Sequence, residues 1–239
     1  MGDRSVIGTT DTRVTNPETK VNDEDRDFVL RQINLSLDLP KPLTKADIIA
    51  ERSGVRALVV GGKSVGEEVD WHKLSRKHVI EVDKSKRMLT IFGGKLTDCL
   101  NVGAEVIAEF KKMGFQLEQK RKWYGEDSGL MPTSFLTAVE QRVETEEKAS
   151  RIAKGLWRRH GSKAQAIVAA ANAAGDTLDE VFEGTGITFA EIEHVIANER
   201  VVSAEDLLRR RLPIAMTRSA KDISNNKKLQ EILRATNLA

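Results

Sequence analysis

The chain has 239 residues, and its 38 lysines and arginines nearly balance its 36 aspartates and glutamates, which leaves a formal net charge of +2. Hydrophobic residues make up 40% of the chain and charged residues 31%, so a folded core is expected and the disordered and low-complexity classes are excluded. No apolar run reaches the roughly 20 residues that a membrane-spanning helix needs, and the N-terminus lacks the apolar segment of a signal peptide. One cysteine excludes an intrachain disulfide, and four scattered histidines give no zinc-binding spacing, so no metal site is predicted. These features predict a cytoplasmic protein, or one that contacts the inner face of a membrane from the side.

The N-terminal part of the chain, to about residue 112, mixes strand-like and helical patterns. Asn22 is a good N-cap and is followed by three acidic residues, which predicts the start of a helix. Val29, Ile33 and Leu37 are spaced by four residues and are expected to form a buried stripe on that helix. Apolar and β-branched residues predict short strands at residues 5–8, 48–49, 55–60, 78–83 and 88–92. The last two strands flank a polar turn and therefore predict a hairpin.

A pair of glycines, Gly93 and Gly94, follows the second hairpin strand and leads into a helical pattern that ends near Gly114. Glycines between a strand and a helix let a ligand approach the backbone N–H groups at the helix start. The same two residues also suit a plain tight turn. The pattern alone does not decide between the two interpretations.

From about residue 130 the periodicity is helical throughout. One apolar face runs over residues 149–160, where Gly161 ends the helix, and Gly175 is expected to end the next one. Capping boxes are predicted from the spacing of three pairs, which are Ser162 with Gln165, Thr188 with Glu191, and Ser203 with Asp206. The chain is therefore expected to have an α+β fold, with a sheet-containing region over residues 1–118, a linker over 119–133 and a helical domain over 134–239.

Three short patterns resemble binding motifs but are incomplete. Residues 60–64 read like the end of a phosphate-binding loop, but Ala57 stands where its first glycine is required. Alternating aspartates at 23–27 resemble the start of a calcium-binding loop, but Phe28 occupies the position that requires glycine. No complete GxGxxG dinucleotide-binding motif is present anywhere in the sequence.

Arg209, Arg210 and Arg211 form a basic run within a C-terminal region that is only mildly basic. Cations in the last turn of a helix complement the helix dipole, so a solvated or interdomain helix face is the first interpretation. Contact with anionic lipid comes second and nucleic acid last, and no nucleic-acid partner is predicted.

Three blocks in register resemble FAD-dependent glycerol-3-phosphate dehydrogenases, namely Ser5–Thr12 (SVIGTTDT), Glu51–Val59 (ERSGVRALV) and Leu74–Gly103, which contains FGGKLT. Glu199–Met216 resembles the helical C-terminal domain of that family. Since the GxGxxG unit that holds the flavin is absent, the chain resembles the C-terminal half of such an enzyme. Two residues depart from the family pattern, because Ala57 replaces a proline and Asp98 replaces a second threonine.

The resemblance implies that residues 1–118 are a partial substrate-binding mixed sheet with a strand–Gly-Gly–helix return to the flavin domain. It implies that Arg56, Arg76 and Lys95 surround the substrate, sn-glycerol 3-phosphate, and that Arg56 and Lys95 act in catalysis. A phosphate dianion indeed requires fixed and preferably forked cations. The contact with the pyrimidine end of FAD is implied for Gly93, Gly94, Lys95, Leu96 and Thr97.

The implied reaction is oxidation of sn-glycerol 3-phosphate to dihydroxyacetone phosphate, with electrons passed through FAD to a quinone. The chain alone is expected to be inactive, because the full-length protein supplies the N-terminal FAD-binding unit. The alternative function is a non-catalytic helical module that binds a protein partner or an anionic surface.

Overall fold

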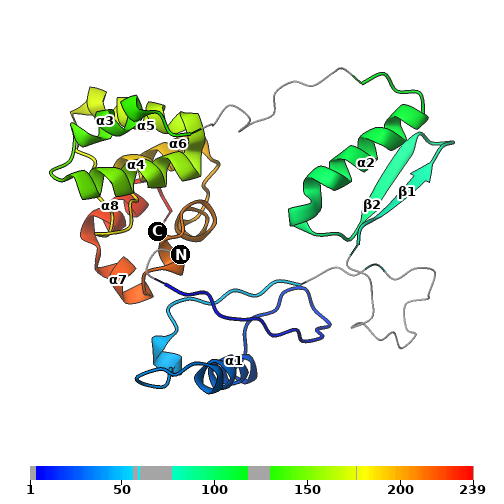
Figure 1. The fold of residues 1–239 in the computed structure, drawn as a ribbon, viewed down its shortest axis with the longest axis horizontal. Helices are drawn as coiled ribbons and strands as arrows, with labels where there is room; N and C mark the ends of the chain where they lie inside the picture. The colour runs from blue at the N-terminus through cyan, green and yellow to red at the C-terminus, as the bar shows by residue number, and fades with distance from the viewer. Residues whose placement is uncertain (1–3, 56–58, 60–76, 118–129, 176, 239) are drawn as a thin grey trace. The chain divides into compact units, whose positions relative to one another are not determined.

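The computed structural model describes residues 4–55, 59, 77–117, 130–175 and 177–238 (Figure 1). Contacts divide the chain into two compact units. Unit 1 consists of Met1–Arg13, Lys20–Ser53 and Lys122–Ala239, and unit 2 consists of Val14–Thr19 and Gly54–Arg121. The predicted domain boundaries at residues 118 and 134 stay a prediction, and most of the predicted linker lies outside the described residues.

The first helix of unit 1, α1 (Asp23–Ser36), begins as the sequence predicts. The Asn22 side chain accepts a hydrogen bond from the Asp25 N–H at 2.8 Å, and the Asp25 carboxylate accepts one from the Asn22 N–H at 3.3 Å. The predicted buried stripe is wrong, because α1 has no buried residue and Leu37 is 52% exposed. Val29 and Ile33 are only half-buried.

The strands predicted at residues 5–8 and 48–49 do not form, and both segments are irregular. The Ile48 N–H instead bonds to the Lys45 carbonyl in the short 3₁₀ helix η1 (Lys45–Asp47). A strand requires a partner for its N–H and C=O groups, and the described residues of unit 1 contain no sheet that these segments could join. The strand predicted at 55–60 falls mostly outside the described residues, and Val55 and Val59 are irregular.

The rest of unit 1 is helical. Its elements are α3 (Thr133–Glu140), α4 (Glu146–His160), η4 (Gly161–Lys163), α5 (Ala164–Ala174), α6 (Phe189–Asn198), the π-helical η5 (Asp206–Arg211), η6 (Ile214–Met216), α7 (Ala220–Asn225) and α8 (Lys227–Ala235). They enclose two hydrophobic clusters, one centred on α3, α4 and α5 and the other on α6, η5 and α8. Among the described residues, no helix is long and apolar enough to span a membrane.

The predicted helix ends of this region are confirmed more often than its capping boxes. Gly161 and Gly175 follow α4 and α5 with φ of 56° and 73°, as predicted. The Ser162 box does not form, because η4 occupies residues 161–163 and α5 begins without a side-chain cap. Thr188 caps α6, but the carboxylate of Glu191 points into an ion cluster instead of back to the cap.

Unit 2 contains a hairpin and a helix. Strand β1 (Val79–Asp83) pairs antiparallel with β2 (Met88–Phe92), with Val79 opposite Phe92, which confirms the predicted hairpin. The chain then passes through η3 (Leu96–Asp98) into α2 (Cys99–Lys112), which lies alongside the hairpin (Figure 1). The described part of the chain is thus mostly helical with one small antiparallel sheet.

Candidate functional site

The residues predicted to contact FAD lie together where β2 passes into α2. Gly93 and Gly94 have φ of 64° and 94°, a backbone region that residues with a side chain rarely adopt. Lys95 returns to an extended conformation, and its carbonyl accepts a hydrogen bond from the Asp98 N–H at 2.9 Å. The predicted succession of strand, two glycines and helix is therefore confirmed.

Gly94 is required by its packing as well as by its backbone angles. A Cβ atom at this position would lie 3.0 Å from the Cβ of His78, which is closer than ordinary packing allows. The need for a tight turn against His78 thus explains Gly94 without a ligand.

The residues after the glycines face outward. Lys95 and Thr97 are exposed, and Leu96 is 90% exposed. Neither η3 nor α2 has a side-chain cap, so no N-cap side chain accepts from the first N–H groups of this helical segment. The turn can therefore offer N–H groups and an ammonium group to a ligand with acceptor oxygens.

A polar cluster behind this turn was not predicted from the sequence. His78 has a side chain that is 9% exposed, and its Nε2 lies 2.8 Å from an oxygen of Glu105 on α2. The other Glu105 oxygen accepts a hydrogen bond from Asn101 at 3.0 Å. The hydrogen bond with His78 lowers the pKa of the Glu105 carboxyl below its usual range. Asn101 and Glu105 are spaced by four residues, which indicates that they meet on one face of a helix. Nothing in the sequence links them to His78.

The other predicted substrate-binding residues cannot be placed beside this turn. Arg56 and Arg76 lie outside the described residues, so their positions stay a prediction. Of the cations predicted to surround the substrate, Lys95 is the one within the described part of the chain.

Comparison with known proteins finds sequences that are similar to this chain. Residues 119–236 match the family model described as the C-terminal domain of alpha-glycerophosphate oxidase. The chain is 27% identical over 221 residues to glycerol-3-phosphate dehydrogenase from Mycobacterium leprae, and these residues cover 90% of the chain. It is 26% identical over 239 residues to glycerol-3-phosphate dehydrogenase 2 from Mycobacterium bovis and 25% identical over 227 residues to the mitochondrial glycerol-3-phosphate dehydrogenase from Mesocricetus auratus. The chain is a homologue of the glycerol-3-phosphate dehydrogenases.

The homology covers nearly all of this chain but only part of its relatives. The chain spans 36%, 39% and 29% of the lengths of the M. leprae, M. bovis and M. auratus proteins. Since the M. bovis alignment covers 97% of the chain, it includes the turn between β2 and α2. The oxidase-domain match covers the helices from α3 to α8.

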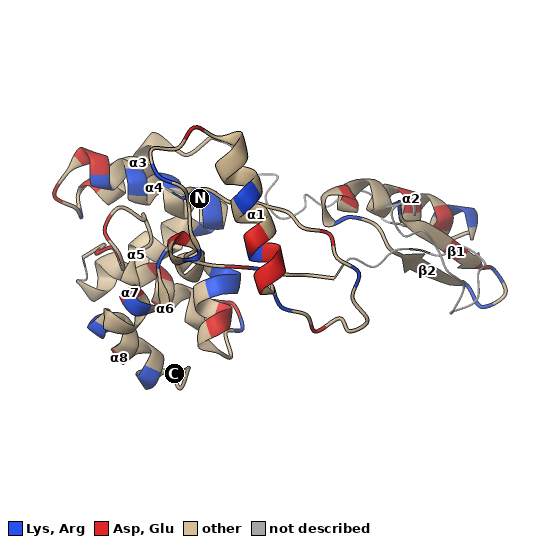
Figure 2. Cartoon of the chain, turned by 90° about the horizontal axis from the view of Figure 1, so that it is seen from below, with Lys and Arg blue, Asp and Glu red and all other residues tan. Residues whose placement is uncertain are grey.

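The basic run of this dehydrogenase homologue is paired within unit 1. Arg209 donates to the backbone carbonyl of Glu51, and Arg211 donates to the backbone carbonyl of Glu199 at 3.0 Å. Arg210 donates to Asp206 at 2.7 Å, and this hydrogen bond lowers the pKa of the Asp206 carboxyl. Basic and acidic residues are interspersed over the helices (Figure 2). These partners favour the first interpretation of the basic run, a solvated or interdomain helix face, over a site for anionic lipid or nucleic acid.

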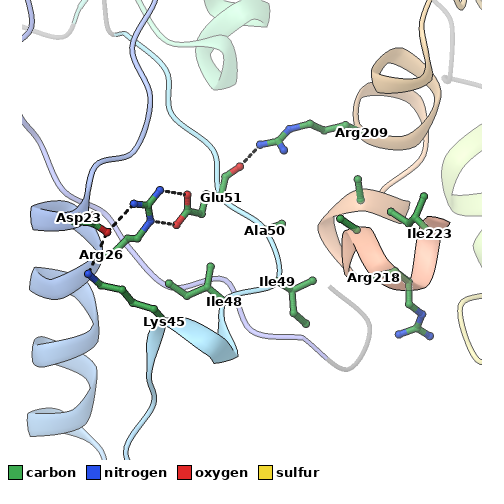
Figure 3. A pocket seen from close by; sticks show the side chains of 12 residues that line it. Asp23, Arg26, Lys45, Ile48, Ile49, Ala50, Glu51, Arg209, Arg218 and Ile223 are labelled. Carbon is green, nitrogen blue, oxygen red and sulfur yellow. Dashed lines mark hydrogen bonds and ion pairs between the residues drawn. The ribbon is translucent and has the colours of Figure 1, made fainter. Parts of the chain in front are cut away.

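A cleft of about 610 Å³ lies beside Arg209, between the segment from Lys45 to Glu51 and the helices around Ile223 (Figure 3). Arg26 donates to both oxygens of Glu51, at 2.5 and 2.8 Å, and Lys45 lies 3.1 Å from Asp23. Hydrogen bonds from Arg26 lower the pKa of the Glu51 carboxyl. These cations already have carboxylate or carbonyl partners, so the positive charges of the cleft are largely neutralised. The cleft is therefore a weaker candidate for an anion site than the turn at Lys95.

Proposed function

We propose that this chain is the C-terminal part of a flavoprotein that oxidises sn-glycerol 3-phosphate to dihydroxyacetone phosphate. The observation that carries the proposal is the uncapped turn of Gly93, Gly94 and Lys95, in a chain that aligns over most of its length with glycerol-3-phosphate dehydrogenases. FAD, when bound, supplies the acceptor for the hydride, and a quinone takes the electrons. The chain alone is inactive in this proposal, because the full-length protein supplies the dinucleotide-binding unit.

The described turn suits the pyrimidine end of a flavin. No N-cap side chain bonds to the first N–H groups of η3, and Lys95 adds an exposed ammonium group. Donors of this kind stabilise negative charge on a neighbouring ring. The exposed side chain of Leu96 adds apolar contact area beside them.

The substrate is a phosphate dianion, and in the proposal this chain holds it through three cations. Arg56 and Arg76 supply guanidinium groups, which bind phosphate oxygens in pairs. Lys95 would act beside the substrate and the flavin in this proposal, where its ammonium group would stabilise the charge that redistributes as the hydride leaves. The protein is placed in the cytoplasm in this proposal, with the inner face of a membrane as the location of the quinone.

The test is to co-express the full chain with the dinucleotide-binding part of the M. leprae relative and to measure bound flavin and dye reduction by glycerol 3-phosphate. We expect Lys95→Ala to lower kcat, and Arg56→Ala to lower kcat/KM by on the order of 2–4 kcal/mol of transition-state stabilisation. Arg76→Ala should mainly raise KM, because it removes binding that ground state and transition state share.

The matched control is Lys86→Ala, which removes an exposed lysine from the hairpin turn, where it lies 3.4 Å from Asp83. This variant should keep the kinetics of the unchanged chain. Unchanged kinetics in both Arg56→Ala and Lys95→Ala would refute the site. A complex that binds flavin but does not oxidise glycerol 3-phosphate would refute the substrate.

A further inference from the structure

His78 stands at the junction between the hairpin and the turn that carries Lys95. It directly precedes β1, and the register of the hairpin places it one position beyond the pair formed by Val79 and Phe92. Its Cβ lies where a side chain at Gly94 would have to be. The Cβ and backbone of His78 thus lie directly against Gly94 in the turn.

The same side chain ties the turn to α2. Its Nε2 lies 2.8 Å from Glu105, which stands in the second turn of α2 and is held by Asn101. Its Nδ1 lies 3.4 Å from the Asp98 carboxylate and, within the described part of the chain, has no hydrogen-bond partner, although this atom is buried. His78 therefore contacts the open end of the hairpin, the turn and the first part of the helix at once.

Asp98 is one of the two positions at which the sequence departs from the glycerol-3-phosphate dehydrogenase pattern. The structure places this carboxylate next to His78, at the end of η3. A ring that carries protons on both nitrogens can donate to Glu105 and face Asp98 favourably, whereas a neutral ring can donate to only one of them. The departure at Asp98 thus adds a second acidic contact to the side chain that supports the turn.

We propose that His78 is a positioning residue, which fixes the N–H groups and the ammonium group of the Gly93–Lys95 turn through its packing on Gly94 and its hydrogen bond with Glu105. The link to catalysis rests on the proposed function, since Lys95 acts there beside the flavin and the substrate. The effect on the turn itself does not depend on that function. The two parts can therefore be tested separately.

The first measurement is amide hydrogen exchange in the full chain. The Asp98 and Cys99 N–H groups report on the turn, because they bond to the carbonyls of Lys95 and Leu96. We expect His78→Leu to speed their exchange by about tenfold, the effect of losing one hydrogen bond, while the Met113 N–H at the far end of α2 changes little. Unchanged exchange at Asp98 and Cys99 would overturn the proposal.

Two conservative variants separate positioning from a general loss of folding. A glutamine amide can occupy the place of Nε2 and an asparagine amide that of Nδ1, so His78→Gln keeps the contact with Glu105 and His78→Asn loses it. We expect exchange in His78→Gln to stay close to that of the unchanged chain, and exchange in His78→Asn to resemble that of His78→Leu. Equal behaviour of the two variants would overturn the proposal even if His78→Leu did not fold.

The second measurement uses the complex with the dinucleotide-binding part. His78→Leu should lower kcat with little change in KM and shift the flavin reduction potential to more negative values, and His78→Gln should restore both. The matched control is Glu109→Gln, which removes a charge from α2 where Glu109 pairs with Lys112 at 2.5 Å. Faster exchange with unchanged kcat and potential would refute the link to the reaction. If the complex does not oxidise glycerol 3-phosphate, the proposed function fails while the exchange result still decides the role of His78 in the turn.

Discussion

Glu191 is a carboxylate with no exposed surface inside the helical part of unit 1. Burial alone would raise the pKa of its carboxyl, but hydrogen bonds from His160 and Arg159 outweigh burial and lower that pKa. Arg159 donates to both oxygens at 2.5 and 2.7 Å, and His160 lies at 2.7 Å. Because α4 carries Arg159 and His160 while α6 carries Glu191, the cluster joins the two helices.

We expect Glu191→Gln to lower the free energy of unfolding by about 3–5 kcal/mol, since the change leaves the largely buried guanidinium of Arg159 without its counter-charge. Urea unfolding at neutral pH, followed by far-ultraviolet circular dichroism, measures this loss. The control is Glu147→Gln, whose carboxylate is 91% exposed and should contribute at most about 1 kcal/mol. Equal losses in the two variants would contradict the importance of the buried cluster.

The same cluster predicts how stability changes with pH. A carboxyl group whose pKa is lower in the folded state contributes stability above its unfolded value near 4.5, and this contribution disappears as the pH falls through the folded value. The unchanged protein should therefore lose stability below about pH 4.5 more steeply than Glu191→Gln does. Parallel acid unfolding curves for the two proteins would show that Glu191 does not titrate as proposed.

At the scale of elements, the junction between β2 and α2 depends on Gly94, where any side chain would be strained. Gly94→Ala would combine a φ of 94° with a contact of 3.0 Å to His78, so we expect it to destabilise α2 and the hairpin by about 1–3 kcal/mol. Gly103→Ala is the control within the same helix, because nothing lies within 4 Å of the added Cβ. That change should stabilise α2 by about 0.5–1 kcal/mol. Hydrogen exchange of α2 measures both, and effects of the same sign would contradict the argument.

Local patterns predicted the elements that depend on local contacts. The Asn22 cap, the glycine ends of α4 and α5 and the β1–β2 hairpin each require only neighbouring residues. The strands predicted at residues 5–8 and 48–49 failed because a strand needs a partner from elsewhere, which β propensity does not supply. The π-helical turn of η5, where the Leu212 N–H bonds to the Leu207 carbonyl, had no sequence signal.

In the candidate site, too, the sequence predicted the local turn but not the contact between residues far apart in the chain. The turn of Gly93, Gly94 and Lys95 was found because paired glycines after a strand mark a change of backbone direction. The His78–Glu105 contact joins residues 27 positions apart and depends on how α2 lies against the hairpin. A single sequence holds no pattern for such a contact.

At the scale of the whole molecule, the two units differ in how much side-chain surface they bury. The buried apolar residues of the described chain all lie between Phe135 and Leu238, in the two clusters of the helical region. The described residues of unit 2 include none, and Met88 and Phe92 on its hairpin are exposed. A two-stranded hairpin with one helix gains little stability from burial of this extent.

We therefore expect the helical region, about residues 130–239, to be the part that folds independently and resists hydrogen exchange most strongly. Its helices are capped locally and its contacts are mostly short in sequence, so it should also form first. In native-state exchange, the N–H groups of Ile152 and Leu156 in α4 and of Val195 in α6 should be at least about 100-fold slower than those of α2, because core amides open only on global unfolding. Uniformly fast exchange from α3 to α8, or protection of α2 equal to that of α4, would refute this expectation. A peptide of residues 130–239 provides the independent check, since it should show cooperative thermal unfolding without the rest of the chain.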